Sequence, residues 1–517
     1  MNKYESDAIT AKLIENGYTL SDSDVADLYI VNTCAVTAES EKKSRQYIAK
    51  CLKHNKNAKI VVCGCASQNN IDQFKDKPNV FSVIGTEGKQ NIVDIIENQT
   101  FKTFDVPNCY ESIANPLITE NNRAFLKIQD GCNNFCNYCL IPYLRGRSRS
   151  RAINDIVAEA NELSKKCKEI VISGIDISSF QPSLGELMKQ LYGVNSRIRL
   201  GSLEVNVITP ELLDILKNMP NFCPQFHLSL QSGCDSVLKR MNRHYTAAQF
   251  KQKVDLIRSY FPYANITTDI IVGFAMETED EFSKTCDFVK SVGFGAAHIF
   301  PYSVRKGTVA SKLYKEDLPL SVKKHRVDVL EDVVAECKKS YISSLIGKTF
   351  TVLTEDKEDD HIVGYSENYI KFYLPLSAKT DTLIKVKLLS CFLDGATGEI
   401  KEWNMEDCLF CKMINGDIST DKVYEDDLMI IIKDINPKAP LHYLAIPKNH
   451  YKYLIEQHED DTLNLGKILN KISKLSTELG LYNGYRLVIN QGDDAGQTVP
   501  HLHIHILAGK PMDWNPA

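Results

Sequence analysis

One ten-residue segment restricts the fold and chemistry of this chain more than any other. It reads DGCNNFCNYC (130–139) and begins at the last residue of an apolar run, AFLKIQD (124–130), that has the pattern of a buried strand. Its cysteines, Cys132, Cys136 and Cys139, are spaced for soft-metal ligation, because a chain of 517 residues needs no disulfide framework. Three thiolates suit an iron–sulfur cluster that keeps one iron open, whereas a structural zinc site would need a distant fourth ligand. The segment predicts a metal-binding loop at the end of a strand.

This strand is the first of six that alternate with helical patterns up to about residue 303. The others are EIVISG (169–174), RIRLGS (197–202), QFHLSL (225–230), ITTDIIVGF (266–274) and AAHIFPYS (296–303). The alternation predicts an α/β fold, a barrel or partial barrel, with its site at the carboxyl ends of the strands. The polar candidates at these ends are Gly174, Asp176, Ser202, Glu204, His227, Gln231, Asp269, Tyr302, Ser303 and Arg305.

The segments on either side predict two more domains. Residues 1–112 alternate strands and helices, and the strands LYIVNTC (28–34) and AKIVVCGC (58–65) end in Cys34 and Cys65. We expect a parallel sheet with these cysteines at the edge where α/β sites lie. Residues 343–404 follow the predicted core (113–342) and contain strand-length runs separated by turn residues, which predicts a small all-β barrel.

Residues 405–517 predict a separate α+β domain. The expected strands are LMIIIKD (428–434), HYLAIP (442–447) and YRLVINQG (485–492), with an amphipathic helix near 461–479 that Gly480 stops. From Met405 onward 16 acidic and 11 basic residues account for the whole net charge of −5, which indicates a module with its own surface. No apolar run reaches the roughly 18–20 residues of a membrane span, and no signal peptide opens the chain. We therefore expect a cytoplasmic protein that makes no membrane contact.

Several motifs beyond the cysteine loop carry a family resemblance. They are NTC (32–34), GC (64–65), RGRSRSR (145–151), LQSGCDSVLKRMNRHYT (230–246) and TDIIVGF (268–274). With KIQDGCNNFCNYC (127–139) they resemble the radical S-adenosylmethionine methylthiotransferases over about residues 1–404. KYES (3–6), NTCAVTAESEKKSRQ (32–46) and KIQDGC (127–132) are similar to the branch that modifies N6-threonylcarbamoyladenosine in tRNA. The isopentenyladenosine branch usually has DSE near its first cysteine, and the ribosomal-protein branch differs around NTC.

This resemblance implies cofactors, a substrate and an electron donor. Cys132, Cys136 and Cys139 would hold a 4Fe–4S cluster whose open iron binds S-adenosylmethionine, and Cys34 and Cys65 would hold part of a second one. The reaction would be methylthiolation of carbon 2 of the adenosine at tRNA position 37, with electrons from flavodoxin or ferredoxin. The polar strand-end residues would hold S-adenosylmethionine. A target in isopentenyladenosine tRNA or a ribosomal protein, and a cluster-deficient tRNA-binding protein without activity, stay open as alternatives.

Two further segments are implied to contact RNA. The β segment at 343–404 resembles the TRAM domain, a small barrel that binds RNA in this family. Four arginines at 145, 147, 149 and 151 form a local basic strip suited to phosphate contacts, with a solvated charged loop as the alternative.

The chain departs from the family pattern at two places. The family's opening motif is G-C-x-x-N-x-x-E-S, and this chain begins inside it, with Asn2 at the position of the asparagine. The cysteine expected three residues before Asn2, and the strand that should precede that cysteine, are therefore missing from the sequence. We expect a start upstream of Met1; the chain as written would then hold only the Cys132/Cys136/Cys139 cluster, with Cys63 as the reserve candidate for a ligand. The motif GFPGET reads GFAMET (273–278), a change that we expect the turn to tolerate.

A second constellation lies near the carboxyl end. HLHIHIL (501–507) predicts a strand with His501, His503 and His505 on one face, and a metal-binding or merely polar face is the alternative on spacing alone. Other motifs make a metal-binding or merely polar face the weaker interpretation. They are DCLFCKMINGDI (407–418), KDINPKAPLHYLAIPKNH (433–450), GDDAGQTVP (492–500) and the closing WNPA. Together they resemble the histidine-triad nucleotide hydrolases.

That resemblance implies a second active site. His503 would attack the α-phosphorus of an adenosine phosphoramidate, since a neutral imidazole is available near pH 7. The residues that would support it, bind phosphate oxygens or contact the ribose are His442, His501, His505, Asn490, Gln497, Thr498 and Asp434. Cys408 and Cys411 look like half of a structural zinc site completed by His450 and one further histidine, or are an unmetallated pair. A homodimer through this domain is also implied.

Overall fold

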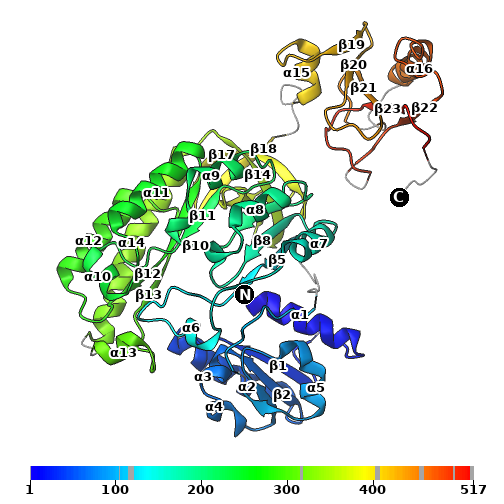
Figure 1. Cartoon of the computed structure of the whole chain (residues 1–517). Helices are drawn as coiled ribbons and strands as arrows, with labels where there is room; N and C mark the ends of the chain where they lie inside the picture. The colour runs from blue at the N-terminus through cyan, green and yellow to red at the C-terminus, as the bar shows by residue number, and fades with distance from the viewer. Residues whose placement is uncertain are drawn as a thin grey trace. The chain divides into compact units, whose positions relative to one another are not determined.

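The computed structural model (Figure 1) describes residues 2–512 except 22, 104, 115–121, 315–317, 402–407, 453, 455–458 and 493–494, and omits the side chains of 38 and 459–463. The chain divides into two compact units, Met1–Ile400 and Lys401–Ala517. The predicted boundary at 404/405 and the closing WNPA lie outside the described residues. None of the described helices is long and apolar enough to cross a lipid bilayer.

The first unit begins with a parallel sheet flanked by helices, as predicted. Its strands are β1 (Leu28–Thr33), β2 (Lys59–Gly64), β3 (Val80–Ile84) and β4 (Phe101–Lys102), in the order β1-β2-β3-β4. Its helices are α1 (Asn2–Glu15), α2 (Ala38–His54), α3 (Cys65–Asn69), α4 (Asp72–Lys75) and α5 (Ile92–Glu97). Alternate residues of β2 pack into two cores, with Val62 against Ile48 of α2 and Cys63 against Ile9 of α1.

The middle of the unit is a half barrel made of two parallel sheets. One sheet contains β5 (Arg123–Lys127), β8 (Glu169–Ser173) and β9 (Arg197–Leu200), and the other contains β10 (Ser202–Leu203), β11 (Gln225–Leu228), β12 (Asn265–Val272) and β13 (Ala296–Pro301). The predicted strand RIRLGS is interrupted at Gly201, where a Cβ atom would lie 2.8 Å from the Ile172 carbonyl oxygen. The barrel is therefore partial. The loops that follow the carboxyl ends of its strands lie at the end where the site was predicted.

Helices cover one face of this half barrel. They are α7 (Ile153–Ser164), α8 (Leu184–Gln190), α9 (Pro210–Lys217), α10 (Asp235–Arg240), α11 (Ala247–Tyr260), α12 (Glu279–Val292) and α14 (Leu320–Ser344). The short helix α13 (Val309–Leu313) packs its Ala310 in a separate cluster with Phe274 and Tyr302. The helix α12 follows the GFAMET turn. The turn forms, as expected, with the Glu277 carboxylate accepting the Gly273 N–H at 2.6 Å. Met276 adopts a left-handed φ of 63° there, a conformation that costs less for the glycine of the family motif.

The unit ends in the predicted all-β barrel, which is closed. Its strands are β14 (Thr349–Glu358), β15 (His361–Ser366), β16 (Lys371–Leu374), β17 (Leu383–Phe392) and β18 (Gly395–Lys401), in the order β14-β15-β16-β18-β17. Buried Glu169 on β8 pairs with Arg197 and Arg199, which also donate to barrel carbonyl groups. The barrel is thus attached at the amino ends of the core strands, where β8 and β9 begin.

The second unit is an antiparallel sheet with two helices. Its strands β19 (Lys422–Glu425), β20 (Met429–Lys433), β21 (Leu441–Pro447), β22 (Tyr485–Val488) and β23 (Ile504–Ala508) have the order β19-β20-β21-β23-β22. Helix α15 (Leu409–Asn415) opens it, and α16 (Glu459–Lys474) packs Ile468 and Ile472 into its core. The helix expected to reach 479 ends at Lys474 and continues as hydrogen-bonded turns up to Gly480.

One prediction for this unit is wrong. The three histidines do not share a strand, because β23 begins only at Ile504. The His501 N–H donates to the Val499 carbonyl oxygen at 2.8 Å, which makes a turn at the point where a straight strand was expected. His501 and His503 therefore precede the strand, and only His505 belongs to it.

Candidate functional sites

The cysteine loop of the core is held in place at both ends. Gly131 has a φ of +74°, and a Cβ atom there would lie 2.0 Å from the Arg147 carbonyl oxygen, so this position requires glycine. The Cys132 N–H donates to Gly146, and the short helix α6 (Ile141–Leu144) begins two residues after Cys139. Asn137 donates from its backbone to Met241 and from its side chain to Arg240. The loop that carries the sulfur atoms is therefore rigidly anchored.

The three sulfur atoms of this loop suit a cluster better than a single ion. Among the described residues two groups place possible ligand atoms within 4.8 Å of one another, and the three loop cysteines are not one of them. A cubane of four irons and four sulfides is wider than one ion, so its cysteine ligands must stand further apart. Burial raises the pKa of Cys132 and of Cys139 to about 12, so each thiol gives up its proton only when a metal takes its place.

Arg243 is a site residue that sequence reasoning missed. Its buried guanidinium donates to the Cys136 sulfur at 3.2 Å and to the Ser229 carbonyl oxygen at 3.1 Å, and it pairs with the Glu204 carboxylate. A charged donor at a cysteine ligand positions the sulfur and stabilises its negative charge. The residue lies inside the motif LKRMNRHYT (238–246), so the resemblance contained the signal, but no local pattern places it beside Cys136.

A cavity of about 300 Å³ adjoins the loop, and its lining includes Asp176 and Glu204. The Asp176 carboxylate lies 4.0 Å from the Cys132 sulfur and accepts a hydrogen bond from Asn134 at 3.3 Å. Its other oxygen is buried and receives no hydrogen bond from the described residues. Burial raises the pKa of both carboxyl groups. An unpaired buried oxygen on a carboxylate beside the Cys132 thiol fits a ligand with amino or hydroxyl donors, as S-adenosylmethionine has.

The remaining strand-end candidates do different things. Gly174 allows the close approach of Gln129, whose side-chain amide donates to the carbonyls of Asp130 and Gly131. His227 and Asp269 form a separate pair at 3.2 Å, Ser202 is exposed on β10, and Gln231 adopts a left-handed φ of 68°. Tyr302 is buried, Ser303 is half-buried, and Arg305 pairs with Glu41 of α2.

The N-terminal cysteines meet at the carboxyl end of their sheet. Thr33 pairs with Gly64 across β1 and β2, so Cys34 and Cys65 follow at neighbouring strand ends. The Arg145 Nε donates to the Cys65 sulfur at 3.1 Å. Cys63 faces the opposite core, packed with Ile9, which argues against it as a ligand beside Cys65.

The predicted basic strip at 145–151 is wrong for two of its four arginines. Arg145 is only 2% exposed and pairs with Glu5 at 2.7 Å and Asp130 at 3.1 Å. Arg151 is buried against Glu159, whereas Arg147 is exposed and lies over the Phe135 ring. Although burial raises the pKa of Glu5, the cations Arg145, Lys89 and Lys127 bring it well below its usual range. Arg145 therefore joins the N-terminal domain to the core and is not available to phosphate.

In the second unit a chain of hydrogen bonds sets the histidine tautomers. The Lys438 N–H donates to His442 Nδ1 at 3.1 Å, so a neutral His442 carries its proton on Nε2. That Nε2 lies 2.9 Å from His505 Nδ1 and 3.3 Å from the Asp434 carboxylate. His503 Nδ1 lies 2.7 Å from the His501 carbonyl oxygen, so it holds the proton and Nε2 keeps its lone pair. This is the arrangement of a nucleophilic imidazole.

Burial keeps these imidazoles neutral. It lowers the pKa of His503, although the bond to the His501 carbonyl opposes the shift, and it lowers that of His505 to about 4.

The residues predicted to contact phosphate differ in their surroundings. Gln497 braces its own loop, accepting from the Gly492 N–H and donating to Lys452 and Val499, while Thr498 is exposed and Asn490 half-buried.

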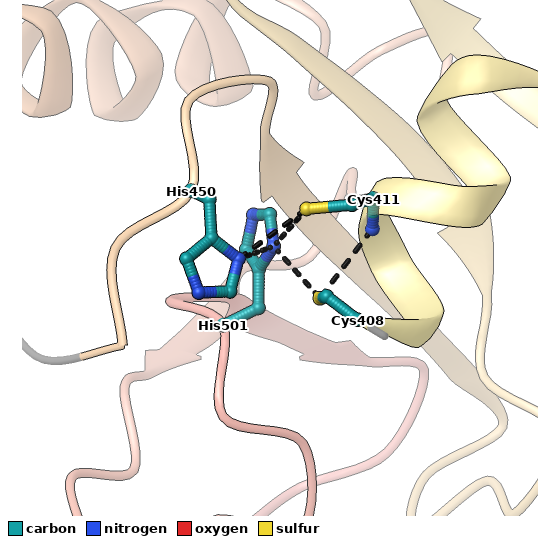
Figure 2. A group of neighbouring side chains, drawn as sticks. All are labelled: Cys408, Cys411, His450 and His501. Atoms are coloured by element: carbon teal, nitrogen blue, oxygen red, sulfur yellow. Dashed lines mark hydrogen bonds between the residues drawn. The ribbon is translucent and has the colours of Figure 1, made fainter. Parts of the chain in front are cut away.

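His501 faces a different group of side chains, with Cys408, Cys411 and His450 (Figure 2). Its Nε2 lies 2.8 Å from the Pro447 carbonyl oxygen and therefore holds the proton, which leaves the Nδ1 lone pair toward the two sulfurs at 3.3 and 3.5 Å. A tetrahedral zinc with ordinary bond lengths needs ligand atoms roughly 3.3–3.8 Å apart. The two cysteines and His450 thus meet as the sequence indicated, and His501 supplies the fourth donor.

Replacing Cys408 or Cys411 by serine should remove a bound zinc. We expect the full-length protein to carry about one zinc per chain, since four soft donors make a closed structural site. Each serine variant should lose that zinc and unfold its second unit at a lower temperature, because the metal stabilises only the folded form. Metal analysis by mass spectrometry with thermal unfolding measures both, and Cys391→Ser, in the β barrel, is the control. Zinc that persists in both variants would contradict the site.

Comparisons with known proteins match both units of the chain. The Radical SAM superfamily model matches residues 126–289, the model described as Uncharacterized protein family UPF0004 matches 1–85, and that described as Scavenger mRNA decapping enzyme C-term binding matches 407–515. The threonylcarbamoyladenosine tRNA methylthiotransferase MtaB of Thermotoga maritima is 36% identical over 421 residues, which cover 77% of this chain and 96% of the relative.

Other relatives extend the same pattern. MtaB of Bacillus subtilis is 34% identical over 414 residues, 75% of this chain and 91% of the relative. The tRNA-2-methylthio-N(6)-dimethylallyladenosine synthase of Staphylococcus aureus is 34% identical over 395 residues, 71% of this chain and 76% of the relative. Among solved structures, a HIT family hydrolase from Legionella pneumophila is 42% identical over 22% of this chain and 100% of that one, with a TM-score of 0.21.

Proposed function

Because the chain belongs to the MtaB-like radical S-adenosylmethionine tRNA methylthiotransferases and carries a C-terminal HIT-family domain, we propose that it modifies N6-threonylcarbamoyladenosine at tRNA position 37. The product would carry a methylthio group on carbon 2 of that adenosine. The observation that carries this choice of substrate is the 36% identity to an MtaB enzyme over 96% of its length. A tRNA substrate places the reaction in the cytoplasm, with flavodoxin or ferredoxin as the electron donor.

The residues of the core suit this chemistry. A cluster held by Cys132, Cys136 and Cys139 supplies, when bound, the electron that starts the radical reaction of S-adenosylmethionine. Arg243 orients the Cys136 sulfur and keeps Glu204 at the cavity. Asp176 offers an unpaired carboxylate oxygen to a bound ligand. The base at position 37 must leave its stack in the RNA before its carbon 2 can reach the reacting group.

The second unit supports a nucleotide hydrolase. In the proposed reaction His503 Nε2 attacks the α-phosphorus of a nucleoside phosphoramidate, the P–N bond breaks, and the departing amine takes a proton. Water then cleaves the nucleotidyl-histidine bond and returns the free imidazole. The Nδ1 proton on the His501 carbonyl keeps Nε2 available, and Asp434 lies beside His442 to receive the ribose. A homodimer through this unit stays part of the proposal.

Nucleoside analysis of tRNA tests the first activity. Deleting the gene should remove 2-methylthio-N6-threonylcarbamoyladenosine from total tRNA and leave its unmethylthiolated precursor, measured by liquid chromatography and mass spectrometry. Restoring the gene should restore the nucleoside. Loss of the methylthio-isopentenyl nucleoside instead would move the substrate to the other branch, and an unchanged nucleoside profile would favour a ribosomal-protein target or a non-catalytic tRNA-binding protein.

A further inference from the structure

The inner face of the half barrel carries a row of rings that the mechanism above does not use. His227 lies on β11, and His298 and Phe300 lie on β13. The ring centroids of His227 and His298 are 5.9 Å apart, and those of His298 and Phe300 are 6.4 Å apart. The planes of each pair are tilted by only 40° and 38°, so the row presents broad ring surfaces.

Strand register shows that these rings share one face. Asp269 pairs with His298 and Ile271 with Phe300 across β12 and β13, and paired residues of adjacent strands point to the same side. The alternate residues of the same strands, among them Ile270 and Ile299, pack into the core beneath the helices. One face of the sheet is therefore apolar and covered, and the other presents imidazoles, a carboxylate and a phenyl ring.

This second face is accessible at the edge of the sheet. Phe300 is 40% exposed, and His298 is exposed beside it. The sheet order is β10-β11-β12-β13, and no strand among the described residues pairs with the free side of β13. The phenyl ring of Phe300 is therefore partly exposed at the edge of this face, beside His298 and opposite Ile271.

The groups around the rings are suited to a purine. His227 Nδ1 lies 3.0 Å from the Thr267 hydroxyl and its Nε2 lies 3.2 Å from the Asp269 carboxylate, so the pair is fixed in position. Asp269 keeps an acceptor surface, and the modified adenine offers its remaining N6–H donor and its ring-nitrogen acceptors. Flipped bases are held between ring surfaces and read by hydrogen bonds at their edges.

We propose that Phe300 and His298 stack on the adenine at tRNA position 37, beside the fixed His227–Asp269 pair. This assignment rests on the proposed function and makes β13 the strand that positions the base. None of these side chains lines the cavity at Asp176, where the cofactor is expected. The phenyl ring supplies sequence-tolerant stacking, and the carboxylate and imidazoles supply edge contacts.

A binding cycle tests this assignment without relying on turnover. The full-length, anaerobically prepared protein with S-adenosylmethionine is titrated with two anticodon stem–loops, one with N6-threonylcarbamoyladenosine at position 37 and one abasic there. We expect the native protein to bind the adenosine form about 5–100 times more tightly, the worth of one base–aromatic stack. Phe300→Ala should bring this ratio close to one, and Phe300→Trp should preserve it.

Tyr192→Ala is the matched control, since Tyr192 is 55% exposed on the same domain and should leave the ratio unchanged. Circular dichroism and iron content show whether each variant is folded. A folded Phe300→Ala protein that keeps the full ratio would overturn the stacking site and leave the proposed function standing. A native protein that binds both stem–loops equally would also overturn it, and one that binds neither would overturn the tRNA substrate as well.

Discussion

Replacing Cys136 by alanine should abolish reductive cleavage of S-adenosylmethionine. The change removes one of three thiolates that hold the cluster, and it leaves the Arg243 guanidinium, which donates to the Cys136 sulfur at 3.2 Å, without that partner. Two ligands hold a cubane poorly, so we expect iron at this loop to fall to background. The formation of 5′-deoxyadenosine should fall at least about a thousandfold, because a group that starts the reaction is lost outright.

The matched control is Cys109→Ala, because Cys109 is exposed and belongs to neither group of metal-type ligands among the described residues. It should keep both iron and cleavage activity. Iron analysis, absorbance of the cluster and chromatography of 5′-deoxyadenosine give the three measurements. A Cys136→Ala protein with its full iron content and normal cleavage would show that another part of the chain holds the cofactor.

Replacing His503 by alanine should eliminate phosphoramidate hydrolysis and leave methylthiolation unchanged. Without the attacking Nε2 the covalent route is closed, and we expect a loss of at least about a thousandfold in kcat/KM. The two reactions use separate units, so the tRNA activity should match that of the native protein. Release of the amine from an adenosine phosphoramidate measures the first activity, and nucleoside mass spectrometry measures the second. Equal loss of both would contradict two independent sites.

The same site predicts a pH profile. His503 attacks as the neutral imidazole, and burial lowers its pKa below the ordinary histidine value of about 6.5. Since the neutral form predominates at every pH above that lowered pKa, kcat/KM should stay flat as the pH falls through 6.5 and decline only below it. An acid limb centred above 6.5 would show that His503 is the cation at neutral pH, contrary to the burial seen here.

Stability of the second unit should follow a related pattern. The His505 pKa is lowered to about 4, so between about 6.5 and 4 the unfolded chain binds a proton that the folded chain does not. Free energy of unfolding therefore falls as the pH drops through this window and is fully retained above it.

Local patterns predicted most of the elements and the loop that carries three cysteines. The alternation of strands and helices identified the half barrel, and turn-separated strands identified the closed barrel at 349–401. Cys132, Cys136 and Cys139 lie within eight consecutive residues, so their proximity follows from the chain itself. The same reasoning failed for HLHIHIL, because the His501 N–H closes a turn onto Val499, His501 Nε2 lies at the Pro447 carbonyl oxygen, and the strand begins only at Ile504.

Residues far apart in the sequence account for what local patterns missed. The sequence predicts Arg145 as part of an exposed basic strip. In the structure Arg145 is buried and contacts Cys65, which lies 80 positions away in the sequence. Cys408 and His501 are 93 positions apart, and Cys408 reaches His501 from the start of α15, which packs against β20 and β21. A spacing of a few residues is set by covalent geometry, so it can be read directly from the order of amino acids. The partner of a buried charge is chosen by which surfaces exclude water together, and that depends on how the whole chain packs.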